Sequence, residues 1–151
     1  MASVNVFDVA QYTLDNLGRL TTWKLQKLCY YSQAWSLVWD EQQLFKQRIE
    51  AWANGPVIPI LYQRHCGQFY VTNIGGDPTK LNETQKETID AVLAAYGNKT
   101  SGWLSQLTHR ESPWRDARNR ARLDLGERGH SQIRLDDMTE YYGGLSAEQA
   151  A

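Results

Sequence analysis

The chain has 151 residues, the size of one globular domain, of which 42% are apolar and 22% charged. This composition excludes a disordered chain, a collagen-like chain and a membrane-spanning protein. Sixteen basic residues against seventeen acidic ones give a net charge of −1, so no overall positive field attracts nucleic acid or anionic lipid.

Two helices are predicted within the first 39 residues. Ser3 or Asn5 can cap a first helix that is apolar on one face and ends at Gly18. Thr21 or Thr22 can cap a second helix, which is apolar on most of its sides. Its largest side chains are Tyr30, Tyr31, Trp35 and Trp39. A helix of this kind is typically the buried centre of its domain.

The middle of the chain is predicted to be partly extended. Residues 44–52 carry only short apolar pairs, which favours an extended segment or a small hairpin. Gly55 permits a backbone angle that other residues avoid, and Pro56 is expected to open a short helix that includes Pro59 and ends near Gly67. Two further features are an extended segment at residues 69–71 and a turn at residues 75–78.

Two helices are predicted after this turn. Asn82 and Gln85 have the spacing of a capping box, and Gly97 is expected to end the helix that they begin. Ser101 is expected to cap a shorter helix that runs through Leu107.

The last two predicted helices complete the chain. Ser112 and Pro113 have the pattern of a cap and a first helical residue, in a helix that reaches toward Leu125. A final helix is expected to end at the glycines at 143–144, with residues 143–151 as a flexible C-terminal tail. The fold class predicted is α+β, predominantly α-helical: a compact single domain with a small extended, hairpin-like element in the middle.

The cysteines and the N-terminal residues indicate in which cellular compartment the protein is expected. Cys29 and Cys66 show no ligand-like spacing, which predicts neither a disulfide framework nor a zinc site. The first nine residues lack both a basic start and a long apolar run, so no signal peptide is expected. We therefore expect a cytoplasmic, reduced protein that makes no membrane contact.

No catalytic motif stands out. A thiol nucleophile would pair Cys66 with His109 across the fold, and the alternative is that both residues are merely structural. His109 and Glu111 are too few ligands for a metal ion, and the glycines form no nucleotide-binding fingerprint. The sequence predicts no enzyme, no cofactor and no small-molecule substrate.

An arginine stripe is predicted on the helix that follows Ser112. Arg115, Arg118 and Arg122 fall within about 60 degrees of one another on a helical wheel, beside Trp114. Residues 110–122 hold five arginines and two carboxylates, a local charge of +3. This is either a solvated helix face or a surface for an acidic protein or phosphate. We expect it to contact a partner, with Trp114 as a partly exposed anchor.

Several segments in order resemble one family. They are residues 9–12, 24–35, 44–45, 49–52, 55–57, 61–62 and 107–109, followed by Glu111, Pro113, Trp114, Ala117 and Arg118. Their order is similar to that of the Panacea domain, found in SocA-like and GepA-like proteins of bacteria and phages. The likeness covers residues 6–122, with a weaker echo up to residue 142, so the predicted domain spans residues 6–142. The matching positions expected to form the scaffold are Leu25, Leu28, Trp35, Trp52, Gly55, Pro56, Tyr62, His109 and Pro113.

The resemblance implies an antitoxin that neutralises a growth-inhibiting toxin by direct protein contact. The toxin is then expected to be encoded by the neighbouring gene. Alternatives are a DNA-binding regulator of its own promoter, a phage or mobile-element accessory protein, and an adaptor that presents a toxin to an ATP-dependent protease. The chain departs from the family pattern at Cys29, at Ser32 and at residues 46–48, so the identity of the toxin does not transfer.

Overall fold

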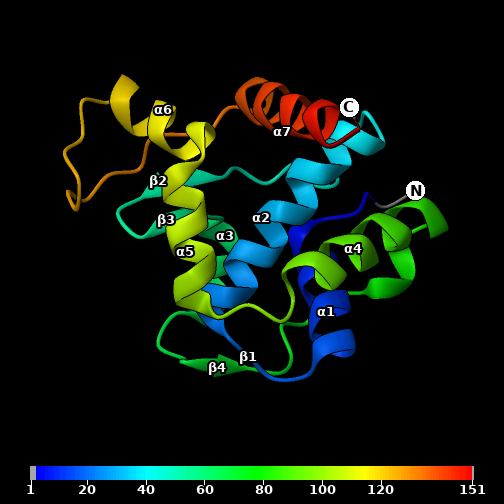
Figure 1. The fold of residues 1–151 in the computed structure, drawn as a ribbon. Coiled ribbons are helices and arrows are strands. Elements are labelled where there is room, and N and C mark those ends of the chain that lie inside the picture. The colour runs from blue at the N-terminus through cyan, green and yellow to red at the C-terminus, as the bar shows by residue number, and fades with distance from the viewer. Residues whose placement is uncertain (1–2, 151) are drawn as a thin grey trace.

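The computed structural model describes residues 3–150, and one helix, α2 (Thr22–Trp39), runs through its middle (Figure 1). Helices α1 (Val6–Leu17) and α4 (Glu83–Tyr96) pack on one side of α2, and α5 (Ser101–Arg110) packs on another. Helix α7 (Leu135–Ala150) lies across the C-terminal end of α2, and α6 (Ser112–Arg120) connects it to α5.

The strands are short and form two antiparallel pairs. Strand β1 (Leu20–Thr21) pairs with β4 (Tyr70–Val71), and β2 (Glu50–Trp52) pairs with β3 (Gly55–Val57) in a hairpin. The short helix α3 (Pro59–His65) follows the hairpin, and a 3-10 turn, η1 (Pro78–Lys80), precedes α4. The predicted α-dominated α+β class with a central hairpin is confirmed.

Helix α2 is buried along most of its length, as predicted. The hydroxyl of Thr21 accepts the backbone N–H of Lys24 at 3.2 Å, and every residue from Leu25 to Ser36 is buried. Its glutamines bind extended backbone: the Gln33 amide oxygen accepts the N–H of Leu44 at 2.6 Å. Buried polar groups are stable when they are hydrogen-bonded in this way. Trp39 differs from the prediction, since 47% of it is exposed.

A second glutamine fixes the segment after the hairpin. The Gln26 amide accepts the N–H of Ile58 at 2.8 Å and donates to its carbonyl at 3.3 Å. The prediction that Pro56 opens a helix is wrong, because Pro56 pairs with Ala51 in the hairpin. The helix begins three residues later, at Pro59. A first-turn proline was expected, but the strand pairing decides which of the two prolines takes that position.

Capping residues predict the helix starts better than glycines predict the helix ends. The Asn82 and Gln85 capping box is present, with both hydrogen bonds at 2.9 Å. Thr100, rather than Ser101, caps α5. Helix α7 continues past the glycines at 143–144, which were expected to end it, to Ala150. The packing of buried Tyr142 against α2 outweighs the weak helix propensity of the glycines. Residue 151 of the predicted tail lies outside the described residues.

Tyrosines surround one buried carboxylate where α2, α6 and α7 meet. The hydroxyls of Tyr31 and Tyr142 donate to the same Glu111 oxygen at 2.6 and 2.8 Å, and Tyr30 lies 3.1 Å from the Tyr142 hydroxyl. Burial raises the pKa of Glu111, and the two tyrosine bonds oppose that rise. These rings and Glu111 tie α7 to the centre of the fold. No helix among residues 3–150 is long and apolar enough to cross a membrane.

Candidate functional site

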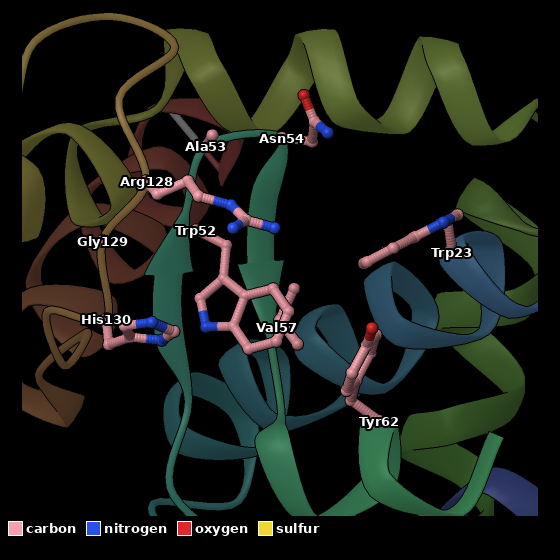
Figure 2. Close-up of a pocket in the computed structure, with 9 residues that line it drawn as sticks. All are labelled: Trp23, Trp52, Ala53, Asn54, Val57, Tyr62, Arg128, Gly129 and His130. Atoms are coloured by element: carbon pink, nitrogen blue, oxygen red, sulfur yellow. The ribbon is translucent and has the colours of Figure 1, made fainter. Parts of the chain in front are cut away.

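A cleft of about 420 Å³ opens beside the β2–β3 hairpin (Figure 2). We call it the hairpin cleft, and its main side chains come from four separate elements. They are Trp23 of α2, Trp52 of β2, Tyr62 of α3, and Arg128 and His130 of the loop between α6 and α7. A cleft of this volume falls within the size range of pockets that bind small ligands.

Aromatic rings form one part of the cleft wall. The ring centroids of Trp52 and Tyr62 are 5.0 Å apart, and those of Trp23 and Tyr62 are 6.0 Å apart. His130 meets Trp52 edge-on at 5.5 Å, and the Trp52 indole N–H donates to a Glu50 carboxylate oxygen at 3.0 Å. All these rings except the exposed His130 are partly buried. The rings are therefore held by neighbours while one side of each stays accessible.

The cleft is positively charged. Arg128 is exposed, and its guanidinium reaches over Trp52 toward the space between Trp23 and Tyr62 (Figure 2). None of the residues that line the cleft is acidic. The Glu50 carboxylate, which accepts the Trp52 indole N–H, pairs with Arg48 at 2.8 Å and with the His130 ring at 3.4 Å. The lining thus leaves Arg128 without a counter-charge inside the cleft.

A buried lysine lies behind the cleft. Lys27 is 1% exposed, and its ammonium nitrogen is 5.4 Å from the centre of the Trp23 ring. Its chain runs against Gly55, where an added Cβ would lie 2.8 Å from the Lys27 Cε. Gly55 also has a φ of +129°, which side chains other than glycine rarely adopt. Burial lowers the pKa of Lys27 to about 8, and none of the ion pairs within residues 3–150 includes it.

Replacing Lys27 with methionine is expected to stabilise the fold by about 3 kcal/mol at pH 7, because a desolvated charge is removed and the volume is kept. The folded-state pKa of Lys27 is lowered from 10.5 to about 8, so between these values the unfolded wild type binds more protons. The unfolding free energy of the wild type therefore rises with pH, and the advantage of Lys27→Met shrinks. Urea unfolding of both proteins from pH 7 to pH 10 measures this, and a constant difference would contradict it.

A family comparison matches the part of the chain that contains the hairpin. The family described as antitoxin SocA-like, Panacea domain, matches residues 25–115, more than half of the protein. The chain belongs to this antitoxin-like Panacea family. No curated protein and no solved structure matches it. The matched segment contains Lys27, Trp52, Gly55 and Tyr62, whereas Trp23 and Arg128 lie outside it.

The predicted arginine stripe of this Panacea domain is not formed. Arg118 is only 3% exposed, and its guanidinium donates to the carbonyls of Ala51 at 3.0 Å, of Asp124 at 2.9 Å and of Glu127. Helix α6 ends at Arg120, so Arg122, with a φ of 55°, no longer follows the helical wheel. Arg115 is exposed on the helix.

Trp114, the expected exposed anchor, is also a core residue. It is 4% exposed, and its indole N–H donates to the carbonyl of Trp52 at 2.9 Å. Trp114 and Arg118 therefore bind the carbonyls of β2 from the protein interior. The accessible cleft is formed by other residues. Trp114 and Arg118 are buried because α6 packs on β2, a contact that a helical wheel does not show.

The predicted thiol and histidine pair is not assembled. Among the described residues, no hydrogen bond joins Cys66 to His109; the Cys66 thiol lies 3.9 Å from the carbonyl of Gln63. His109 stacks on Trp114 with ring centroids 4.0 Å apart. Its buried Nε2 has no hydrogen-bond partner within residues 3–150. Burial lowers the pKa of His109, and so do the positive charges of Lys27 and Arg118, although a bond to the Asn54 backbone opposes this.

The structure separates the predicted scaffold positions into two groups. Six of the nine are buried, and His109, Trp52 and Tyr62 are half-buried; the buried ones are Leu25, Leu28, Trp35, Gly55, Pro56 and Pro113. Trp52 and Tyr62 instead line the cleft. Sequence reasoning missed Trp23, Arg128 and His130, which belong to no motif. The one available signal was that Trp52 and Tyr62 flank the Gly-Pro pair.

Within residues 3–150 no group of three or more His, Cys, Asp or Glu side chains could hold a metal ion.

Proposed function

We propose that this Panacea-family protein is an antitoxin that neutralises a growth-inhibiting toxin by direct protein binding. The observation that carries the proposal is the match of the antitoxin SocA-like family to residues 25–115. The matched elements, from α2 to the start of α6, include both strands of the hairpin. The proposed partner is a protein encoded by the neighbouring gene, in the same cytoplasm.

A binding role also suits the surface that the fold presents. Trp23, Trp52 and Tyr62 keep accessible ring surface, and Arg128 stands beside them. Tryptophan, tyrosine and arginine are the residue types that dominate binding energy at protein interfaces. Nothing comparable favours DNA binding, because Arg118, the centre of the expected basic stripe, is occupied by backbone carbonyls. A regulator would need accessible cations that follow the phosphate backbone.

Co-expression with the product of the neighbouring gene tests this function. We expect the neighbour to arrest growth alone, and we expect this protein to restore growth and to co-purify with it. A Cys66→Ala variant is a matched control, because Cys66 is exposed and a binding protein needs no thiol chemistry. Growth arrest that persists, together with the absence of a complex, would show that the proposed function is wrong. Loss of rescue in Cys66→Ala would point to thiol chemistry instead.

A further inference from the structure

We propose that the hairpin cleft receives an acidic segment of the toxin, with a carboxylate placed against Arg128 and its aliphatic part against Trp23, Trp52 and Tyr62. This inference rests on the proposed function and adds to it the surface and the chemistry of the partner. It depends on the charges, the rings and one buried lysine, all of which converge on the same cleft.

Charge complementarity selects an acidic occupant. The lining contains Arg128 and His130 and no carboxylate. Arg128 takes part in none of the ion pairs among residues 3–150. Glu50, behind His130, is already satisfied by Arg48 at 2.8 Å and by the Trp52 indole at 3.0 Å. The Arg128 guanidinium is thus the cation of the cleft that can pair with an incoming group. It suits a carboxylate because it can donate two parallel hydrogen bonds.

Lys27 strengthens the preference for an anion. Its ammonium lies between the Trp23 ring, at 5.4 Å, and the hairpin backbone at Gly55. A buried charge without an ion pair destabilises a fold, and an apolar side chain of the same volume would avoid that cost. A carboxylate that enters the cleft is attracted by this charge. The attraction acts through protein, whose effective dielectric constant is lower than that of water, so it is stronger than it would be in solvent. Lys27 therefore acts on the occupant through its electric field, without direct contact.

The rings define the rest of the occupant. Figure 2 shows the rings of Trp52, Tyr62 and Trp23 beside one another, with the Arg128 side chain above Trp52. Trp52 and Tyr62 are in edge contact, with ring centroids 5.0 Å apart. The Trp52 ring is held by its bond to Glu50 and by His130, so little freedom is lost when a partner packs on it. Flat apolar walls below a cation fit a segment in which an aspartate or glutamate is next to an apolar residue. A chain segment of this kind fills the cleft better than a free inorganic anion, which would leave the rings uncovered.

Binding of purified variants to the product of the neighbouring gene, measured by calorimetry, tests the inference. Arg128→Glu is expected to weaken binding at least tenfold, because it places like charges together in a desolvated contact. Lys80→Glu makes a similar change of charge on η1, which packs against α1, and is expected to stay within about twofold of the wild type. Circular dichroism verifies that both variants are folded.

Lys27→Met provides a test in which weaker binding cannot be explained by misfolding. The variant is expected to unfold at higher urea concentration and still to bind the toxin several-fold more weakly, a combination typical of functional residues. If Lys27→Met is more stable and binds as well as the wild type, the contribution of Lys27 to recognition is wrong.

A charge-reversal scan identifies the acidic segment. Each aspartate and glutamate of the toxin is changed to lysine, and one such change is expected to restore binding to the Arg128→Glu variant. Failure of every reversal to restore binding would overturn the acidic chemistry.

If the wild type binds and Arg128→Glu binds equally well, the proposed contact at the cleft is wrong while the antitoxin function stands. If Arg115→Glu alone abolishes binding, the exposed side of α6 is the contact surface. If the wild type does not bind, the antitoxin function is wrong, and this inference with it.

Discussion

Replacing Trp35 with alanine is expected to lower the free energy of unfolding by about 3–5 kcal/mol, the cost typical of a large aromatic ring truncated in a core. Trp35 is 5% exposed, and its indole N–H donates to the Tyr96 hydroxyl at 3.0 Å. Its ring centroid lies 5.6 Å from that of Tyr142. The truncation therefore leaves a cavity where α2, α4 and α7 meet and deprives Tyr96 of its donor.

Trp39 is the natural control for Trp35. It is four residues further along the same helix, 47% exposed, and stacked on Trp35 with ring centroids 4.8 Å apart. Because much of its surface already faces water, Trp39→Ala is expected to cost about 1 kcal/mol. Urea unfolding followed by far-UV circular dichroism gives both values. Equal losses for the two variants would contradict the burial that distinguishes them.

Short-range patterns in the sequence predicted much of the fold. A helix N-cap depends on a side chain and a backbone N–H two or three residues away. Asn5 and Asn82 both form complete capping boxes. The local sequence predicted the box at Asn82 and left Ser3 or Asn5 as the cap of the first helix. The burial of α2 was predictable for the same reason, since apolar residues on most sides of a helix leave no face for water. These features survive in any tertiary arrangement that keeps the helices.

Long-range contacts decided what the sequence could not. The choice between Pro56 and Pro59 depended on the pairing of Pro56 with Ala51, and the course of the last helix depended on Tyr142. A helical wheel gives the direction of Arg118 but not what packs there. In the structure, β2 lies on that side, and its carbonyl at Ala51 requires a donor.

The hairpin cleft could not be assembled from the sequence. Its walls come from residues as far apart as Trp23 and His130, and no spacing rule connects them. Trp52 and Tyr62 were recognised as part of the scaffold, but their accessible surface depends on the loop that carries Arg128. Exposure is a property of the whole fold, so a motif alone does not separate a core aromatic from one that lines a cleft.

Replacing Arg118 with methionine is expected to lower the free energy of unfolding by about 4 kcal/mol, since three hydrogen bonds from a charged donor are lost together. The Ala51 carbonyl belongs to β2 and is left without this donor in a buried place. The carbonyls of Asp124 and Glu127 belong to the loop that leads to Arg128. Methionine keeps the packing volume on Trp114, whose ring centre is 5.2 Å from the guanidinium carbon. The loss is thus assigned to the bonds rather than to a cavity.

Arg115→Met is the matched variant on the same helix, and its cost is expected to stay within about 0.5 kcal/mol because Arg115 is exposed. Hydrogen exchange separates the local effect from the global one. In Arg118→Met, the amides of residues 121–130 are expected to exchange faster than in the wild type under conditions where α2 remains protected. Unchanged exchange in this loop would show that Arg118 does not hold it. Since the loop carries Arg128 over the cleft, its release is also expected to weaken toxin binding while Arg115→Met leaves it intact.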